Sequence, residues 1–151
     1  MEQIIQLNNQ AKLSEHFVLG EFTKSGSHPE IYNIPCHEAI ANLKRLCIWL
    51  EVLRERSGGP VRINSGYRSP QLNRAIHGNA NSNHMTGCAC DIRVSGMEQA
   101  LRYAVILMDY ADESKQEFDE LLIERNRYGA IWVHFAVRPK ENRRKILFIN
   151  A

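Results

Sequence analysis

Two histidines and one aspartate in this chain have the chemistry and the spacing of a metal site. His84 and Asp91 lie seven residues apart in SNHMTGCACDI, and Gly87 between them allows a turn that lets both side chains face one point. His134 lies in the apolar run AIWVHFAV, where an imidazole on a buried strand needs a polar partner. Two imidazoles and one carboxylate form the open ligand set of catalytic zinc, which leaves the fourth position for water.

The spacing alone leaves a plainer interpretation open, because a histidine on an apolar strand is more often a hydrogen-bonded core residue. Cys88 and Cys90 offer a further candidate pair for zinc or redox chemistry. In CACDIRV, however, alternation places these two cysteines on the opposite side of the strand from Asp91, which predicts small core residues. For all four cysteines we expect free thiols, since a chain of 151 residues without a secretion signal needs no disulfide framework.

Alternating helix and strand patterns surround these residues. Apolar residues recur at helical spacing from Pro35 to Arg56 and predict an amphipathic helix that ends at SGGP. VRIN then predicts a short strand, and a second helix follows with Ser69 as its N-cap and Pro70 as its first residue. LSEHFVLGEF, near the N-terminus, predicts a short helical turn, and HGNANSN predicts a loop.

A third helix and three final strands follow CACDIRV. Ser95 to Glu98 match a capping box, and we expect the helix to run to about Asp109. FDELLIE, AIWVHFAV and KILFIN, separated by RNRYG and RPKENRR, predict three successive antiparallel strands. The order of elements predicts the α+β class, with a single domain over residues 1–151 whose helices pack on one side of an antiparallel sheet. The other face of the sheet is then free for a site.

The composition is that of a globular protein and argues against several classes of partner. Hydrophobic residues make up 44% and charged residues 24% of the chain. A net charge of +2 with dispersed Lys and Arg predicts no nucleic-acid partner, and no apolar run approaches the roughly 20 residues of a membrane span. Met1 to Lys12 lacks the features of a signal peptide, so we expect the chain to be made and kept in the cytoplasm unless lysis or another export route releases it. We also expect it to be a monomer.

Three segments resemble the motifs of one enzyme family, the zinc D-alanyl-D-alanine carboxypeptidases. SGYRS is similar to their Ser-Gly-Tyr-Arg-Ser motif, SNHMTGCACD to Ser-x-His-x-x-Gly-x-Ala-x-Asp, and WVH to Trp-x-His, in the same order and at similar separations. The family includes bacterial carboxypeptidases, D-alanyl-D-alanine dipeptidases and phage endolysins, and it shares a fold with the hedgehog signalling domain. The likeness extends from LSEHFVLGEF to WVHFAV and is greatest to small phage-type members without signal peptides.

The resemblance implies a role for each matching residue. It makes His84, Asp91 and His134 the ligands of one zinc ion per chain, and it makes Arg68 the arginine that holds the substrate. A guanidinium can grip a peptide carboxylate with two hydrogen bonds, which lysine cannot do. Ser82, two residues before the first ligand, matches a second residue on the substrate side.

The general base is the part of the motif from which this chain departs. In the hydrolysis that the resemblance implies, a carboxylate takes the proton of the zinc-bound water. Many family members carry this acid three residues before the last histidine, where this chain has Ile131. Alternation in FDELLIE places Phe118, Glu120, Leu122 and Glu124 on one face and Asp119 on the other. Glu124 resembles a glutamate of the small phage-type members and is the expected base, with Glu120 as the alternative.

The resemblance favours a zinc peptidase that cuts D-amino-acid-containing bonds of peptidoglycan peptides. It would act as a D-alanyl-D-alanine carboxypeptidase or as a cross-link endopeptidase, in wall remodelling or as a phage lysis or tail component. The acid missing at Ile131 leaves a second function open, a zinc-containing peptidoglycan-binding module with weak or no turnover. A purely structural virion or assembly protein is the third. Zinc content separates the third hypothesis from the others, and peptide release separates the first from the second.

Overall fold

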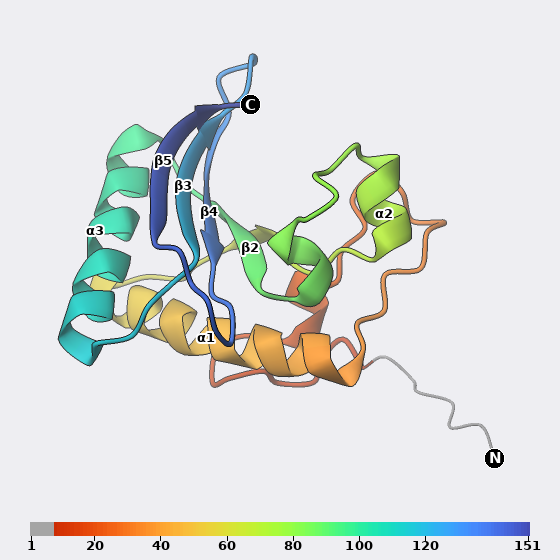
Figure 1. Cartoon of the computed structure of the whole chain (residues 1–151), viewed down its shortest axis with the longest axis horizontal. Helices are drawn as coiled ribbons and strands as arrows, with labels where there is room; N and C mark the ends of the chain where they lie inside the picture. The colour runs from red at the N-terminus through yellow and green to blue at the C-terminus, as the bar shows by residue number, and fades with distance from the viewer. Residues whose placement is uncertain (1–7) are drawn as a thin grey trace.

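The computed structural model describes residues 8–151, which fold into helices and strands in the order expected from the sequence (Figure 1). The helices are η1 (Leu19–Phe22), α1 (His37–Ser57), α2 (Pro70–Ala75), η2 (Asn83–Thr86) and α3 (Met97–Ser114). The strands are β1 (Ile63–Ser65), β2 (Ala89–Arg93), β3 (Glu120–Arg125), β4 (Ile131–Ala136) and β5 (Lys145–Asn150). No helix in the described range combines the length and the hydropathy needed to cross a bilayer. Residues 1–7 lie outside that range, so the expectations for Met1 to Lys12 and for one domain over 1–151 stay predictions.

The five strands form one sheet with the order β1-β2-β4-β3-β5. Neighbouring strands are antiparallel except β3 and β5, which pair in parallel. The α+β class is confirmed, but the expectation that the last three strands are successively antiparallel is wrong for this pair. The chain leaves β4 and crosses the start of β3, where Asp119 accepts hydrogen bonds from the backbone and side chain of Arg143. This crossing places β5 at the outer edge of the sheet.

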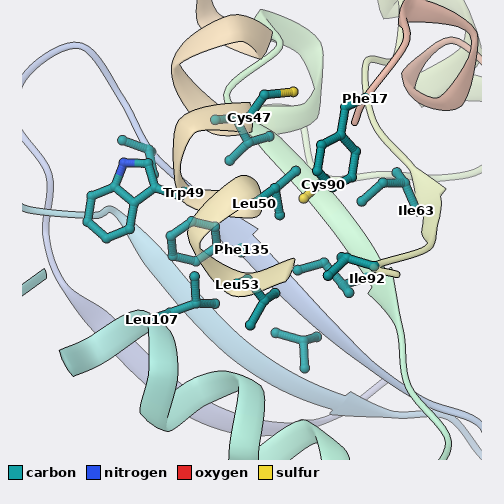
Figure 2. Packing of buried hydrophobic residues seen from close by; sticks show 14 of the residues in the cluster. Phe17, Cys47, Trp49, Leu50, Leu53, Ile63, Cys90, Ile92, Leu107 and Phe135 are labelled. Atoms are coloured by element: carbon teal, nitrogen blue, oxygen red, sulfur yellow. The ribbon is translucent and has the colours of Figure 1, made fainter. Parts of the chain in front are cut away.

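One face of the sheet carries the hydrophobic core beneath α1 and α3 (Figure 1, Figure 2). The expected apolar stripe of α1 is buried there, and Trp49 packs against Phe135 of β4 with ring centroids 5.5 Å apart. Leu107 of α3 and Cys90 of β2 complete the same cluster. The two long helices α1 and α3 thus cover one side, and the polar site lies on the opposite face.

The sequence predicts the N-cap of α2 correctly but not the N-cap of α3. Ser69 caps α2 as expected, because its hydroxyl accepts a hydrogen bond from the Leu72 N–H at 3.1 Å. The capping box expected at Ser95 to Glu98 is wrong, since Gly96 occupies the N-cap of α3 without a side-chain bond. The Ser95 N–H instead donates to the Gln99 side chain, and α3 continues past Asp109 to Ser114.

Candidate metal centre

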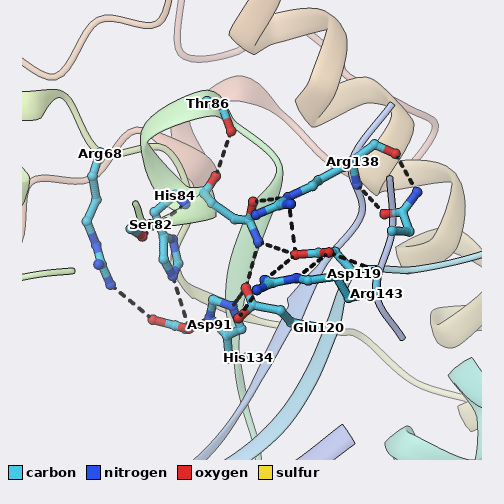
Figure 3. Close-up of polar contacts among 12 residues, drawn as sticks. Arg68, Ser82, His84, Thr86, Asp91, Asp119, Glu120, His134, Arg138 and Arg143 are labelled. Atoms are coloured by element: carbon cyan, nitrogen blue, oxygen red, sulfur yellow. Dashed lines mark hydrogen bonds and ion pairs between the residues drawn. The ribbon is translucent and has the colours of Figure 1, made fainter. Parts of the chain in front are cut away.

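His84, Asp91 and His134 converge on the open face of the sheet (Figure 3). Asp91 in β2 and His134 in β4 are direct register partners, so their side chains stand side by side. His84 reaches the same point from η2, the turn that leads into β2. His84 Nε2 lies 3.3 Å and His134 Nδ1 lies 3.1 Å from Asp91 Oδ1. The structure therefore brings the distant His134 to the pair formed by His84 and Asp91.

The donor atoms of these residues fit a tetrahedral divalent metal. One ligand atom from each residue lies within 4.8 Å of the others, and all three residues are buried. At the zinc–ligand lengths of proteins, tetrahedral ligand atoms lie about 3.3 Å apart, close to the two distances to Asp91. The outer nitrogen of each histidine ring, which faces away from Asp91, also has a hydrogen-bond partner. His84 Nδ1 donates to the Gly66 carbonyl at 2.6 Å, and His134 Nε2 lies 3.0 Å from Glu120 Oε1. The inner nitrogens are thus turned toward Asp91.

The electrostatics of the cluster keep its carboxylate ionised. Burial alone would raise the pKa of Asp91, but the neighbouring His84 and His134 hold this pKa far below its usual range. Burial lowers the pKa of His134, whereas its hydrogen bonds to Asp91 and Glu120 outweigh that effect and raise the pKa to about 9. A metal ion would take the place of the proton on His134, because imidazole binds metals in its neutral form.

The turn that carries His84 is fixed by close contacts. Gly87 ends η2 in the left-handed conformation with φ of 76°, and a Cβ there would lie 2.4 Å from the Ala39 carbonyl oxygen. The Ser82 hydroxyl accepts a hydrogen bond from the His84 N–H at 3.2 Å, and the His84 carbonyl accepts one from the Arg68 N–H at 3.0 Å. Gly87 is therefore required both by its φ and by its contact with α1.

A cavity of about 480 Å³ opens above the three residues. Arg68 lines it and donates to Asp91 Oδ2 at 3.4 Å, on the side of the cluster away from Glu120 (Figure 3). Ser82 also lines the cavity, as expected, while its hydroxyl serves the backbone of His84. Both residues expected on the substrate side therefore lie at the site.

The two candidate carboxylates of β3 meet different surroundings in this cavity. Glu120 forms a hydrogen bond with His134. Glu124 lines the cavity wall nearby, where burial and the negative charge of Asp91 raise its pKa. Glu120 and Glu124 lie on the same face of β3, as predicted. The predicted alternation is wrong for Phe118 and Asp119, the two residues before the strand. Phe118 lies in the core with its ring centroid 6.2 Å from that of Trp49, and Asp119 is buried beside the site. The regular pattern begins only where the strand begins.

A buried polar cluster beside the metal residues was not predicted from the sequence. The fully buried Asp119 accepts hydrogen bonds from Arg143 at 2.8 and 3.0 Å and from Asn83 at 2.7 Å. Arg138 Nε donates to Asn83 Oδ1 at 2.9 Å. The charged segment RPKENRR was the available signal, but its partners lie far away in the sequence.

The cysteines lie apart from the metal residues. Cys88 and Cys90 are buried as expected, and Cys90 belongs to the core cluster, where burial raises its pKa well above the ordinary thiol value. Cys47, on α1, is buried in the same core, and burial raises its pKa to about 12. All four cysteines are free thiols in the structure. Within residues 8–151 the metal-type cluster contains no cysteine.

The comparisons with known proteins identify a family and similar solved structures. The family model of peptidase M15 matches residues 15–131, a range that contains His84 and Asp91 and ends three residues before His134. No curated protein matches the chain. Among solved structures, the L-Ala D-Glu endopeptidase ChiX of Serratia marcescens is similar at 20% identity and a TM-score of 0.44, over 74% of this chain and 96% of that one.

Proposed function

The chain belongs to the peptidase M15 family, and on this premise we propose that it is a zinc-dependent peptidase acting on peptidoglycan peptides. The observation that carries the proposal is the convergence of His84, Asp91 and His134 at the floor of an open cavity. Two imidazoles and a carboxylate leave a coordination position for water, as catalytic zinc sites require. The bonds cut are those that contain D-amino acids, as in the family that the motifs resemble.

In the proposed reaction His84, Asp91 and His134 hold the zinc ion. When bound there, zinc would supply an activated water at neutral pH and would polarise the carbonyl of the scissile bond. The Glu124 carboxylate acts as general base: it accepts a proton from the water and passes it to the nitrogen of the leaving amine. Its raised pKa suits this task, because a base works best with a pKa near the working pH.

Arg68 positions the substrate in this proposal. Its side chain is mostly buried at the cavity wall, and its one hydrogen bond to a described residue is the contact with Asp91 at 3.4 Å. Most of its N–H groups are thus left to bind a substrate carboxylate or carbonyl. Ser82 lies on the same wall and contributes a second polar group.

One observation favours a second function, a zinc-containing peptidoglycan-binding module without turnover. The acid that many related sequences carry three residues before the last histidine is Ile131 here, and Ile131 packs against the core. If Glu124 does not replace that acid, metal and substrate would still bind, but the proton would not be moved.

Digestion of purified peptidoglycan distinguishes these functions. Zinc-loaded protein is incubated with it and the products are identified by mass, with His134→Ala as the inactive control. Loss of a terminal D-alanine would identify a carboxypeptidase, and opening of a cross-link or stem peptide would identify an endopeptidase. Sedimentation with peptidoglycan without any product would identify the binding module. No product and no sedimentation would contradict both.

A further inference from the structure

Glu120 contacts the outer nitrogen of one candidate metal ligand. Its Oε1 lies 3.0 Å from His134 Nε2, while Nδ1 of the same ring faces Asp91. A neutral imidazole carries its proton on one nitrogen only, so a carboxylate that accepts from Nε2–H leaves the Nδ1 lone pair free for a metal. The contact therefore selects both the tautomer and the orientation of the ring.

Glu120 is itself held by the buried polar cluster. Asn83 Nδ2 donates to Glu120 Oε1 at 2.6 Å and to Asp119 Oδ2 at 2.7 Å. Arg138 Nε donates to Asn83 Oδ1 and so fixes the orientation of the side-chain amide, and Arg143 Nη2 lies 3.6 Å from Glu120 Oε2. Asn83 immediately precedes His84, so the residue that holds Glu120 is also the chain neighbour of another candidate metal ligand.

We propose that Glu120 is a positioning residue that orients His134 for metal binding, with Asn83 holding Glu120 in place. The outer nitrogen of His84 instead contacts a backbone group, the Gly66 carbonyl at 2.6 Å. Of these two hydrogen bonds, only the one to His134 can therefore be removed by changing a side chain. Glu120 Oε1 already accepts from two donors, whereas no such bond ties Glu124 to a ligand among the described residues. The two glutamates of β3 thus divide the work, one orienting a ligand and the other moving the proton.

The inference rests on the proposed zinc site, and zinc affinity tests it without any substrate. Competition with a chromophoric chelator gives the affinity of wild type, Glu120→Ala, Glu120→Gln and the control Glu117→Ala, which removes an exposed glutamate just before β3 and outside the cavity. Loss of the outer partner of a histidine ligand weakens metal binding by about 10–100-fold, and we expect this for Glu120→Ala. Glu120→Gln keeps an oxygen for Nε2–H and recovers most of the affinity. Glu117→Ala binds zinc like wild type.

Each outcome decides the role of Glu120. Equal zinc affinity in wild type and Glu120→Ala would overturn this role. The role would also be overturned if Glu120→Gln bound zinc as weakly as Glu120→Ala, or if Glu117→Ala lost as much affinity as Glu120→Ala. A wild type that binds no zinc would instead remove the proposed function and this inference with it. The melting temperature of each metal-free variant checks the fold. If Glu120→Ala does not fold, Glu120→Met fills the space without an acceptor and takes its place.

Discussion

At the scale of single residues, Glu120 and Glu124 project from one face of β3 into surroundings that shift their pKa values in opposite directions. Burial raises the pKa of Glu120, but the hydrogen bond from His134 outweighs it and leaves this pKa below its ordinary value. Burial and the charge of Asp91 raise the pKa of Glu124. Two carboxylates whose pKa values are pushed apart by their surroundings commonly have different roles in a site.

The role of Glu124 predicts the behaviour of Glu124→Gln. This change keeps the shape of the side chain and removes its basicity, so we expect zinc binding to persist while the rate of hydrolysis falls about 10²-fold or more. Turnover of peptidoglycan peptides and zinc content, measured on the same preparation, check this. A fully active Glu124→Gln would show that Glu124 is not the general base. The base would then be Glu120 or no side chain of β3.

Arg68→Lys tests the substrate residue in a similar way. Lysine keeps the charge but cannot make two parallel hydrogen bonds to a carboxylate, so we expect hydrolysis to weaken about tenfold. Zinc content and melting temperature should stay close to wild type, because the Asp91 contact of Arg68 is long, at 3.4 Å. An unchanged rate would place Arg68 outside the substrate site.

At the scale of elements, the site depends on how η2 is seated against α1. Gly87 ends η2 with φ of 76°, and its backbone lies against the Ala39 carbonyl. Gly129, in the turn between β3 and β4, has φ of 84° but no atom within 4 Å of the position that a Cβ would take. The two glycines therefore separate the effect of a left-handed φ from the effect of a close contact.

We expect Gly87→Ala to be clearly worse than Gly129→Ala. An alanine in the left-handed region costs about 1–2 kcal/mol, which is all that Gly129→Ala should lose. Gly87→Ala adds a clash with backbone and should lose about 2–5 kcal/mol. It should also bind zinc more weakly, because η2 carries His84. Chemical denaturation and zinc titration of both variants measure this. Equal losses would show that the contact with α1 is unimportant.

At the scale of the whole molecule, the sheet separates a hydrophobic core from a polar site, and Asp119 joins the site to the edge strand. Asp119 is fully buried, pairs with Arg143 and Arg138, and accepts from the segment that carries the chain over to β5. Burial raises the pKa of Asp119, but the hydrogen bonds from Arg143 and Asn83 outweigh it and lower this pKa below its ordinary value.

The lowered pKa of Asp119 predicts a loss of stability in acid. A carboxylate with a lower pKa in the folded state stabilises the fold above its unfolded pKa of about 3.9 and loses that contribution as the pH falls further. Asp119→Asn should be about 1–3 kcal/mol less stable at pH 7, and its deficit should shrink below about pH 4. Denaturation of both metal-free proteins across this range checks the prediction. A deficit independent of pH would contradict it.

The local patterns of the sequence predicted the elements, and distant contacts decided the rest. Strand alternation predicted that Asp91 faces the opposite side from Cys88 and Cys90, and the family resemblance predicted that His84 and His134 meet at one point. The parallel pairing of β5 with β3 could not be predicted, because it depends on the contact of Asp119 with Arg143 across 24 residues. The hydrogen bond between Glu120 and His134 could not be predicted either, because it depends on the register in which β3 pairs with β4.

Metal analysis of the purified protein tests the central claim, that His84, Asp91 and His134 form one zinc site. After zinc loading and removal of free metal, we expect one zinc ion per wild-type chain. His84→Ala and His134→Ala should fold, as circular dichroism can verify, and should retain almost none, because two ligands do not hold zinc as three do. Folded His84→Ala and His134→Ala proteins that carry as much zinc as wild type would contradict the account.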